Sequence, residues 1–350
     1  MVTNNKKMEL LKSIEYNPSS KANPILVAIR SNPYLYSLIV KARIWFSRNI
    51  LSKQLIKKFN DNVDIFNLND NERKHVKELD ENGITVLENY FDREQVTEID
   101  NKIDSLFRKL NINMNGGYNV SHGRLKTLKG MSYEELSITE QAITIKDPLL
   151  KVPEVIKIAF NESFLKIVSN YFGYVPTHAT NISRSFPHIP PIESSYFHKD
   201  SIEHEVLHIF IYLVDVDNNG GPFCYIPKTH KNDVESCRAV TSYDLGKKDS
   251  YGRISDKEIK KSYPETEWMP INAKKGSVVI VNVNGFHKGP MWIGNDINQL
   301  RARDVLQINF RSINKNRKLR TKSGKLFSKD IKNFTNIQKL FLDNYEIIED

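Results

Sequence analysis

The hydrophobic pattern of the chain changes at Gly173. Before this glycine, apolar residues recur mainly at helical spacing. After it, the apolar segments are short, rich in β-branched residues and separated by turn residues. Several short strands joined by Gly-rich turns favour a jelly-roll or cupin-like barrel. The predicted strands are 178–184, 205–215, 223–226, 277–281 and 304–310.

The first half of the chain predicts helices that flank this β core. A helix is expected over 71–83, a short strand over 84–87, and a second helix from an N-cap at Asp92 to about residue 110. A longer helix is expected over 150–172, closed by Gly173. The run 218–221 predicts a hairpin turn. The expected fold class is α+β with a mainly β core, namely a double-stranded β-helix (jelly roll, cupin-like) with flanking helices.

Three residues in the second half have the composition of a metal site. His198 and Asp200 are separated by one residue, and His287 follows Asp200 by 87 positions. Residues i and i+2 of a strand point to the same face, so His198 and Asp200 can hold one metal ion together. His287 follows a predicted strand and would reach the ion from across the barrel. Two imidazoles and one carboxylate are the facial triad of non-haem Fe(II) oxygenases.

Further motifs surround these residues and carry a resemblance to a known family. They are the entry segment 78–91, the element His198-Lys-Asp200, the segment 219–230 with Asn-Gly-Gly-Pro, and the segment 276–303. In this order and spacing the chain resembles the phytanoyl-CoA dioxygenase family of Fe(II)/2-oxoglutarate-dependent oxygenases, over roughly 72–312.

The resemblance implies the cofactor, the co-substrate and the roles of individual residues. His198, Asp200 and His287 match the iron ligands, and Arg303 matches the arginine that binds the distal carboxylate of 2-oxoglutarate. The sixteen residues from His287 to Arg303 exceed the usual spacing of the family, so Arg301 is a rival for that role. Thr180 lies where the family lines the co-substrate pocket. The resemblance also implies hydroxylation with release of succinate and CO2, because related halogenases lack a carboxylate at the position of Asp200.

The charge distribution suggests three regions. Residues 1–60 predict a basic helical N-terminal extension with 11 Lys and Arg against two Glu, 72–312 the dioxygenase domain, and 313–350 a basic C-terminal tail with a terminal helix. The basic ends are either solvated or a dock for an anionic partner, such as a membrane surface, a CoA-type substrate or a carrier protein. If the protein contacts a membrane surface, we expect the contact to use the N-terminal segment. We expect no nucleic-acid partner, since neither end has a recognised binding motif.

Other features limit the localisation and leave alternative functions open. The chain has two cysteines, no signal-peptide core and no apolar run of membrane-spanning length, which favours a cytoplasmic protein. The alternatives are a non-catalytic jelly-roll module, a cupin-like metalloenzyme without 2-oxoglutarate, and a nucleic-acid dealkylase. His204 and His208 share one face of a predicted strand but have no evident third ligand, so we interpret them as pocket or sheet residues.

Overall fold

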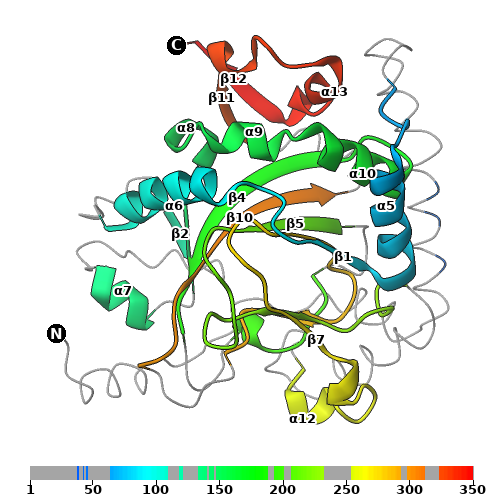
Figure 1. Ribbon diagram of the computed structural model, residues 1–350, viewed down its shortest axis with the longest axis vertical. Coiled ribbons are helices and arrows are strands. Elements are labelled where there is room, and N and C mark those ends of the chain that lie inside the picture. Colours follow the sequence, from blue (N-terminus) through cyan, green and yellow to red (C-terminus); the bar gives the residue numbers. More distant parts are fainter. Residues whose placement is uncertain are drawn as a thin grey trace.

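A seven-stranded antiparallel sheet forms the centre of the protein (Figure 1). The computed structural model describes Leu38, Ala42, Trp45 and residues 64–108, 118–120, 133–139, 142–145, 147–187, 193–200, 206–231, 254–292, 298–311 and 323–349. The strand order of this main sheet is β1-β8-β5-β10-β4-β3-β2. Its strands are β1 (Ile84–Leu87), β2 (Tyr118–Val120), β3 (Ala142–Ile145), β4 (Thr177–Ser185), β5 (Val206–Tyr212), β8 (Val278–Asn282) and β10 (Arg303–Arg311).

A small sheet lies opposite one face of the main sheet (Figure 1). It contains β7 (Met269–Ile271), β6 (Phe223–Tyr225) and β9 (His287–Lys288), in that order. An antiparallel bridge between His198 and His287 adds a fourth strand segment beside β9. From β4 onwards the chain passes repeatedly between the two sheets, and all these pairings are antiparallel. This arrangement is a jelly roll, as the sequence predicted.

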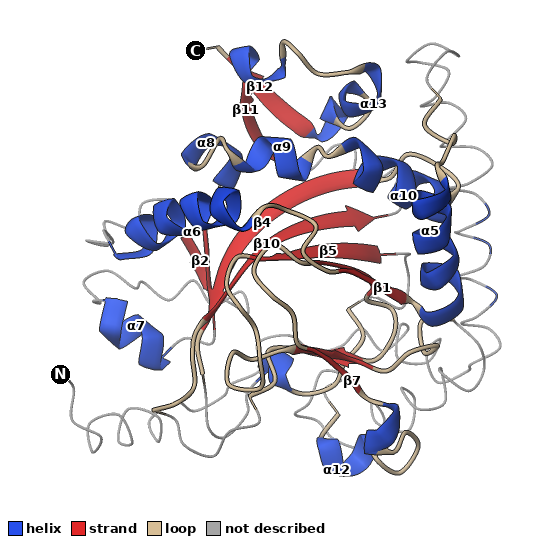
Figure 2. Cartoon of the chain, in the orientation of Figure 1, coloured by secondary structure: helices blue, strands red, loops and turns tan. Residues whose placement is uncertain are grey.

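Most of the helices cover the other face of the main sheet, whereas α12 (Asp256–Ile259) lies beside the small sheet (Figure 2). The N-terminal predictions are confirmed: α5 begins with a capping box at Asn69 and ends at Gly83, and Asp92 accepts hydrogen bonds from the first turn of α6. The helices are α5 (Asp70–Asn82), α6 (Arg93–Arg108), α7 (Tyr133–Thr139), α8 (Pro148–Lys151), α9 (Val155–Ala159), α10 (Glu162–Phe172), α12 (Asp256–Ile259) and α13 (Asn336–Lys339).

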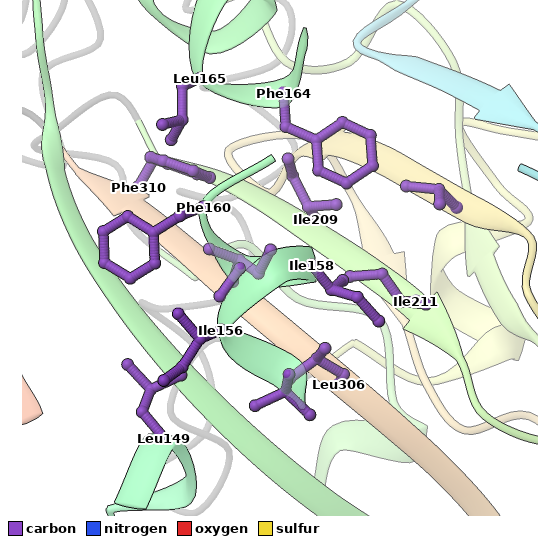
Figure 3. Packing of buried hydrophobic residues seen from close by; sticks show 14 of the residues in the cluster. Leu149, Ile156, Ile158, Phe160, Phe164, Leu165, Ile209, Ile211, Leu306 and Phe310 are labelled. Atoms are coloured by element: carbon purple, nitrogen blue, oxygen red, sulfur yellow. The ribbon is translucent and has the colours of Figure 1, made fainter. Parts of the chain in front are cut away.

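The core between helices and sheet is apolar and fully buried (Figure 3). Ile156 and Ile158 of α9 lie over the main sheet, and Phe164 comes from α10. Alternate residues of β10, such as Leu306 and Phe310, point toward these helices. Burial of each such side chain contributes about 1.5–3 kcal/mol relative to exposure. This packing fixes the main sheet as a rigid base for the strands that face the barrel interior.

The single helix predicted over 150–172 is three short helices. Helix α8 ends at Lys151, before Pro153, whose ring clashes with a continuing helix and whose nitrogen has no proton to donate. Helix α9 ends at Ala159, and Asn161 then caps α10 by accepting a hydrogen bond from the backbone N–H of Phe164. The apolar periodicity runs through both breaks, because all three helices pack on one sheet face.

The predicted hairpin at 218–221 is a turn between sheets. Asp217 caps this turn by accepting hydrogen bonds from the N–H groups of Asn219 and Gly220. However, β5 belongs to the main sheet and β6 to the small sheet, so the two strands do not pair with each other. Local turn chemistry marks the reversal but does not determine which strand becomes the partner.

The described part of the C-terminal segment, residues 323–349, combines two strands with short helices. Strands β11 (Gly324–Phe327) and β12 (Tyr345–Ile348) form a parallel pair, and its longest described helix has four residues. Leu326, Phe341 and Tyr345 are buried in the main core. The Tyr345 hydroxyl lies 2.7 Å from Nδ1 of His178 on β4. Residues 323–349 are therefore packed against the barrel domain.

Some predictions concern residues outside the described ranges. The N-terminal extension 1–60, with its suggested membrane contact, is described only at Leu38, Ala42 and Trp45, which are helical. His204 also lies outside the described residues. None of the described helices has the length and apolar character needed to cross a bilayer.

Candidate metal centre

His198, Asp200 and His287 converge inside the barrel, on the side of the small sheet. The backbones of His198 and His287 exchange two hydrogen bonds, of 2.8 and 3.0 Å. The backbone N–H of Asp200 donates to the carbonyl of Val283 at 3.0 Å. These three contacts bring residues that are far apart in sequence to one place and fix their backbones there.

The side chains of these residues place their donor atoms close together. Oδ1 of Asp200 lies 3.4 Å from Nε2 of His198 and 3.7 Å from Nε2 of His287. One ligand atom from each residue lies within 4.8 Å of the other two. Within the described ranges, this is the one set of three His, Cys, Asp or Glu side chains arranged to hold a metal ion.

Backbone carbonyls orient both imidazoles. Nδ1 of His198 lies 2.8 Å from the carbonyl oxygen of Tyr196, and Nδ1 of His287 lies 3.0 Å from that of Gly285. With Nδ1 as the donor, each ring can present the lone pair of Nε2 to a cation. The ring of Phe223 stacks on His287 with an interplanar angle of 30°. Both rings are thus held in the tautomer and orientation that a metal requires.

The charge of the cluster also suits a divalent cation. Desolvation raises the pKa of Asp200, but the hydrogen bonds and charges of His198 and His287 outweigh it and hold the pKa well below its ordinary value. The carboxylate is therefore ionised and needs positive charge beside it. A cation bound at both Nε2 atoms would take the place of the histidine protons that lower this pKa. Two imidazoles and one carboxylate are suitable ligands for iron, and they leave other coordination positions open.

Arg303 lies in the barrel with an incompletely paired guanidinium. Arg303 is 9% exposed, and its Nη1 donates a hydrogen bond to the carbonyl of Gly221 at 2.9 Å. Nε has no hydrogen-bond partner, and no described carboxylate forms an ion pair with Arg303. Burial lowers the pKa of this group. A buried guanidinium without a counter-ion is costly, so the arrangement fits an anionic ligand that pairs with it.

The other two residues predicted for the co-substrate lie elsewhere. Arg301 precedes β10, and its side chain is 52% exposed and paired with Asp217 at 2.7 Å. Thr180 pairs with Ile308 in the register of β4 and β10, which places it on the helix-covered face of the sheet. Successive strand residues face opposite sides, so Thr180 points away from the metal-binding residues. The structure therefore pairs Arg301 with Asp217 and turns Thr180 to the helix-covered face, so neither side chain joins Arg303 in the barrel.

Comparison with known proteins agrees with this geometry. The phytanoyl-CoA dioxygenase (PhyH) family matches residues 79–292, which is more than half of the chain. The chain belongs to the phytanoyl-CoA dioxygenase family. All three candidate ligands lie within the matched range, whereas Arg303 follows it. No curated protein matches the chain at a significant level.

Solved structures similar to this family member include several 2-oxoglutarate-dependent enzymes. EctD from S. alaskensis, solved with 2-oxoglutarate and 5-hydroxyectoine, is 14% identical, with 69% of this chain and 76% of that chain covered and a TM-score of 0.47. EvdO2 from Micromonospora carbonacea var. aurantiaca is 15% identical, with 70% and 91% covered and a TM-score of 0.47. The carbocyclase SnoK from nogalamycin biosynthesis is 14% identical, with 72% and 87% covered and a TM-score of 0.44.

The structure places further residues beside the cluster, and one of them is His208, which the sequence analysis interpreted as a pocket or sheet residue. Nδ1 of His208, on β5, lies 3.8 Å from Oδ2 of Asp200. Burial lowers the pKa of His208 to about 4, so its ring is neutral at pH 7. Gln307 and Asn309 of β10 lie beside it. The shared strand parity of Arg303, Gln307 and Asn309 was the available signal, because residues i, i+4 and i+6 of a strand face the same side.

Proposed function

We propose that this member of the phytanoyl-CoA dioxygenase family is an Fe(II)- and 2-oxoglutarate-dependent hydroxylase of a small molecule. His198, Asp200 and His287 would hold the iron, and Arg303 would bind the distal carboxylate of 2-oxoglutarate. The observation that carries the proposal is the pairing of an ionised metal-binding cluster with a buried, incompletely paired guanidinium in one barrel. We further propose residues 72–312 as the catalytic domain.

Each protein group would have a defined task. The carbonyls of Tyr196 and Gly285 keep the Nδ1 protons in place, so both imidazoles present Nε2 throughout the reaction. Arg303 would bind the co-substrate from one end and thereby orient its other end toward the cluster. Phe223 and Tyr225 of the small sheet are buried in an apolar cluster and would limit access of water. Bound iron would supply oxygen activation coupled to decarboxylation of 2-oxoglutarate to succinate and CO2.

The guanidinium separates this proposal from a cupin-like metalloenzyme that does not use 2-oxoglutarate. Such an enzyme has no need for a cation buried within the barrel. Arg303 has no described acidic partner that would make it a structural ion pair, unlike Arg184, which pairs with Asp304 and Asp104. A dicarboxylate ligand gives Arg303 the counter-ion that the protein lacks.

The test is the requirement for each component in succinate formation. Purified protein is freed of metal, reloaded anaerobically with Fe(II), and exposed to O2 with 2-oxoglutarate and candidate substrates. Succinate should form when iron, 2-oxoglutarate and O2 are all present, and a true substrate should increase its rate. Succinate formation that persists without iron, or a loaded protein that fails to bind 2-oxoglutarate, would exclude the proposal.

A further inference from the structure

A group of uncharged polar residues lies beside the metal cluster on the inner side of the main sheet. We name Asn181, His208, Gln307 and Asn309 the inner polar strip. In the strand register Asn309 is opposite His208, and Gln307 is opposite Asn181. Partners in register lie on the same face, so the four side chains share the side of the sheet that faces the barrel interior.

Hydrogen bonds within the strip determine where His208 carries its proton. The side-chain nitrogen of Gln307 donates to Oδ1 of Asn309 at 2.6 Å and lies 3.0 Å from Nδ1 of His208. An amide nitrogen can only donate, so Nδ1 of His208 accepts and the ring proton resides on Nε2. His208 is 5% exposed, and its Nε2 has no hydrogen-bond partner. The strip therefore holds a buried donor that is ready for an oxygen acceptor.

The position of the strip distinguishes it from the co-substrate anchor. Gln307 and Asn309 follow Arg303 by four and six residues, or about 13 and 20 Å along a strand. His208, by contrast, lies 3.8 Å from Asp200. The strip is thus beside the metal-binding residues and away from the arginine that would bind the distal carboxylate.

Resting on the proposed function, we infer that the inner polar strip binds the reacting part of the substrate, and that this part carries uncharged hydroxyl or carbonyl oxygens. Nε2 of His208 donates to one such oxygen. An alkyl chain in the same place would bury this donor without an acceptor, which is unfavourable. The substrate class is therefore polyhydroxylated, as in sugars and nucleosides, and does not consist of long-chain acyl thioesters.

The strip itself has no charge, but a charged group follows it. Arg311, two residues after Asn309, is exposed at the end of β10. A phosphate on a hydroxylated substrate would meet this side chain outside the strip. The hydroxylated compounds in the test therefore include phosphorylated ones.

The experiment measures succinate formed by the iron-loaded enzyme with two sets of compounds. One set contains methyl glycosides, nucleosides and sugar phosphates, and the other contains straight-chain and branched acyl-CoA thioesters. At least one hydroxylated compound should increase the rate of succinate formation several-fold, and the thioesters should not. Stimulation by thioesters alone, or no stimulation by any hydroxylated compound, would overturn the inference.

Variants of the strip separate a binding role from a structural one. His208→Leu should raise the KM for the stimulating compound about tenfold or more, since about 1.4 kcal/mol corresponds to a factor of ten. His208→Gln keeps a side-chain N–H donor and should restore part of the loss. Failure of the proposed function gives a different result, because the wild-type protein would then not bind 2-oxoglutarate. An unchanged KM in His208→Leu would contradict a role of the strip in binding.

Discussion

Strand β10 has two faces that are both largely buried but differ in chemistry. Leu306, Ile308 and Phe310 point toward the helices and are 0% exposed. Arg303 and Asn309 point into the barrel and are 9% and 8% exposed. The first face is buried by apolar partners from its own chain, whereas the second keeps a guanidinium without a carboxylate. The comparison shows that burial alone does not separate core from site; the available partners do.

The largest expected effect is on Fe(II) affinity, when a proposed metal ligand on the barrel side is substituted. His198→Ala should lower the affinity for Fe(II) by at least about 100-fold. Loss of a residue that only hydrogen-bonds to a metal ligand already lowers metal affinity about 10–100-fold. Secondary structure should not change, because the bridge to His287 is made by backbone groups. Calorimetric titration with Fe(II) under anaerobic conditions gives the affinity, and circular dichroism checks the fold.

His75→Ala is the matched control for this loss. His75 is a buried histidine of α5 that contacts Thr85, distant in the fold from the barrel cluster. Its substitution should leave the Fe(II) affinity unchanged. Equal losses in both variants would mean that the cluster at His198 is not the metal site.

The helix-covered face predicts an effect on stability instead. Leu306→Ala should lower the free energy of unfolding by about 2–5 kcal/mol, because it removes buried methyl groups and leaves a cavity between sheet and helices. Urea unfolding measures this change. The folded variant should still bind Fe(II) with wild-type affinity. A large loss of metal affinity in the folded variant would show that the two faces are not independent.

A buried histidine on the same face predicts a dependence of stability on pH. Burial lowers the pKa of His178 to about 4, against about 6.5 in the unfolded chain, and its ring lies between the Ala159 carbonyl and the Tyr345 hydroxyl. Between these values the unfolded state binds the proton more strongly, so stability falls as pH decreases from 6.5 to 4, by up to about 3 kcal/mol. His178→Phe should flatten this part of the stability profile. An unchanged slope would assign the pH dependence to other groups.

The sequence predicted the core strands and the convergence of His198, Asp200 and His287 for the same physical reason. Alternation along a strand fixes which residues share a face, and His198 with Asp200 follows that rule directly. Thr180 lies on the helix-covered face, because a shift of one residue along a strand reverses the face. Composition does not reveal which face a residue takes in a strand that carries polar residues on both sides. Asn181, the next residue of β4, faces the interior.

Long-range contacts explain the remaining differences. The turn at 218–221 has local hairpin chemistry, yet its strands pair with distant segments in two sheets. The C-terminal residues Leu326 and Phe341 are buried by helices that lie far away in sequence. The choice between Arg301 and Arg303 depended on where β10 begins, and strand ends are the least certain part of any sequence pattern.

The smallest effect is expected at the arginine outside the barrel. Arg301 forms an exposed ion pair with Asp217, and exposed pairs contribute about 0–1 kcal/mol. Arg301→Leu should therefore change the free energy of unfolding only slightly and leave 2-oxoglutarate affinity unchanged. Urea unfolding and calorimetry check the two expectations. A strong loss of 2-oxoglutarate affinity would return the co-substrate role to this residue.

Binding of 2-oxoglutarate measured by anaerobic calorimetry tests the central claim most directly, because it requires the metal cluster and the buried guanidinium to act on one molecule. Wild-type protein loaded with Fe(II) should bind 2-oxoglutarate, and affinity should fall about 30-fold or more either without metal or in Arg303→Leu, as expected when a charged hydrogen bond of about 2 kcal/mol or more is lost. Equal affinity in the loaded wild type, the metal-free protein and Arg303→Leu would contradict the account.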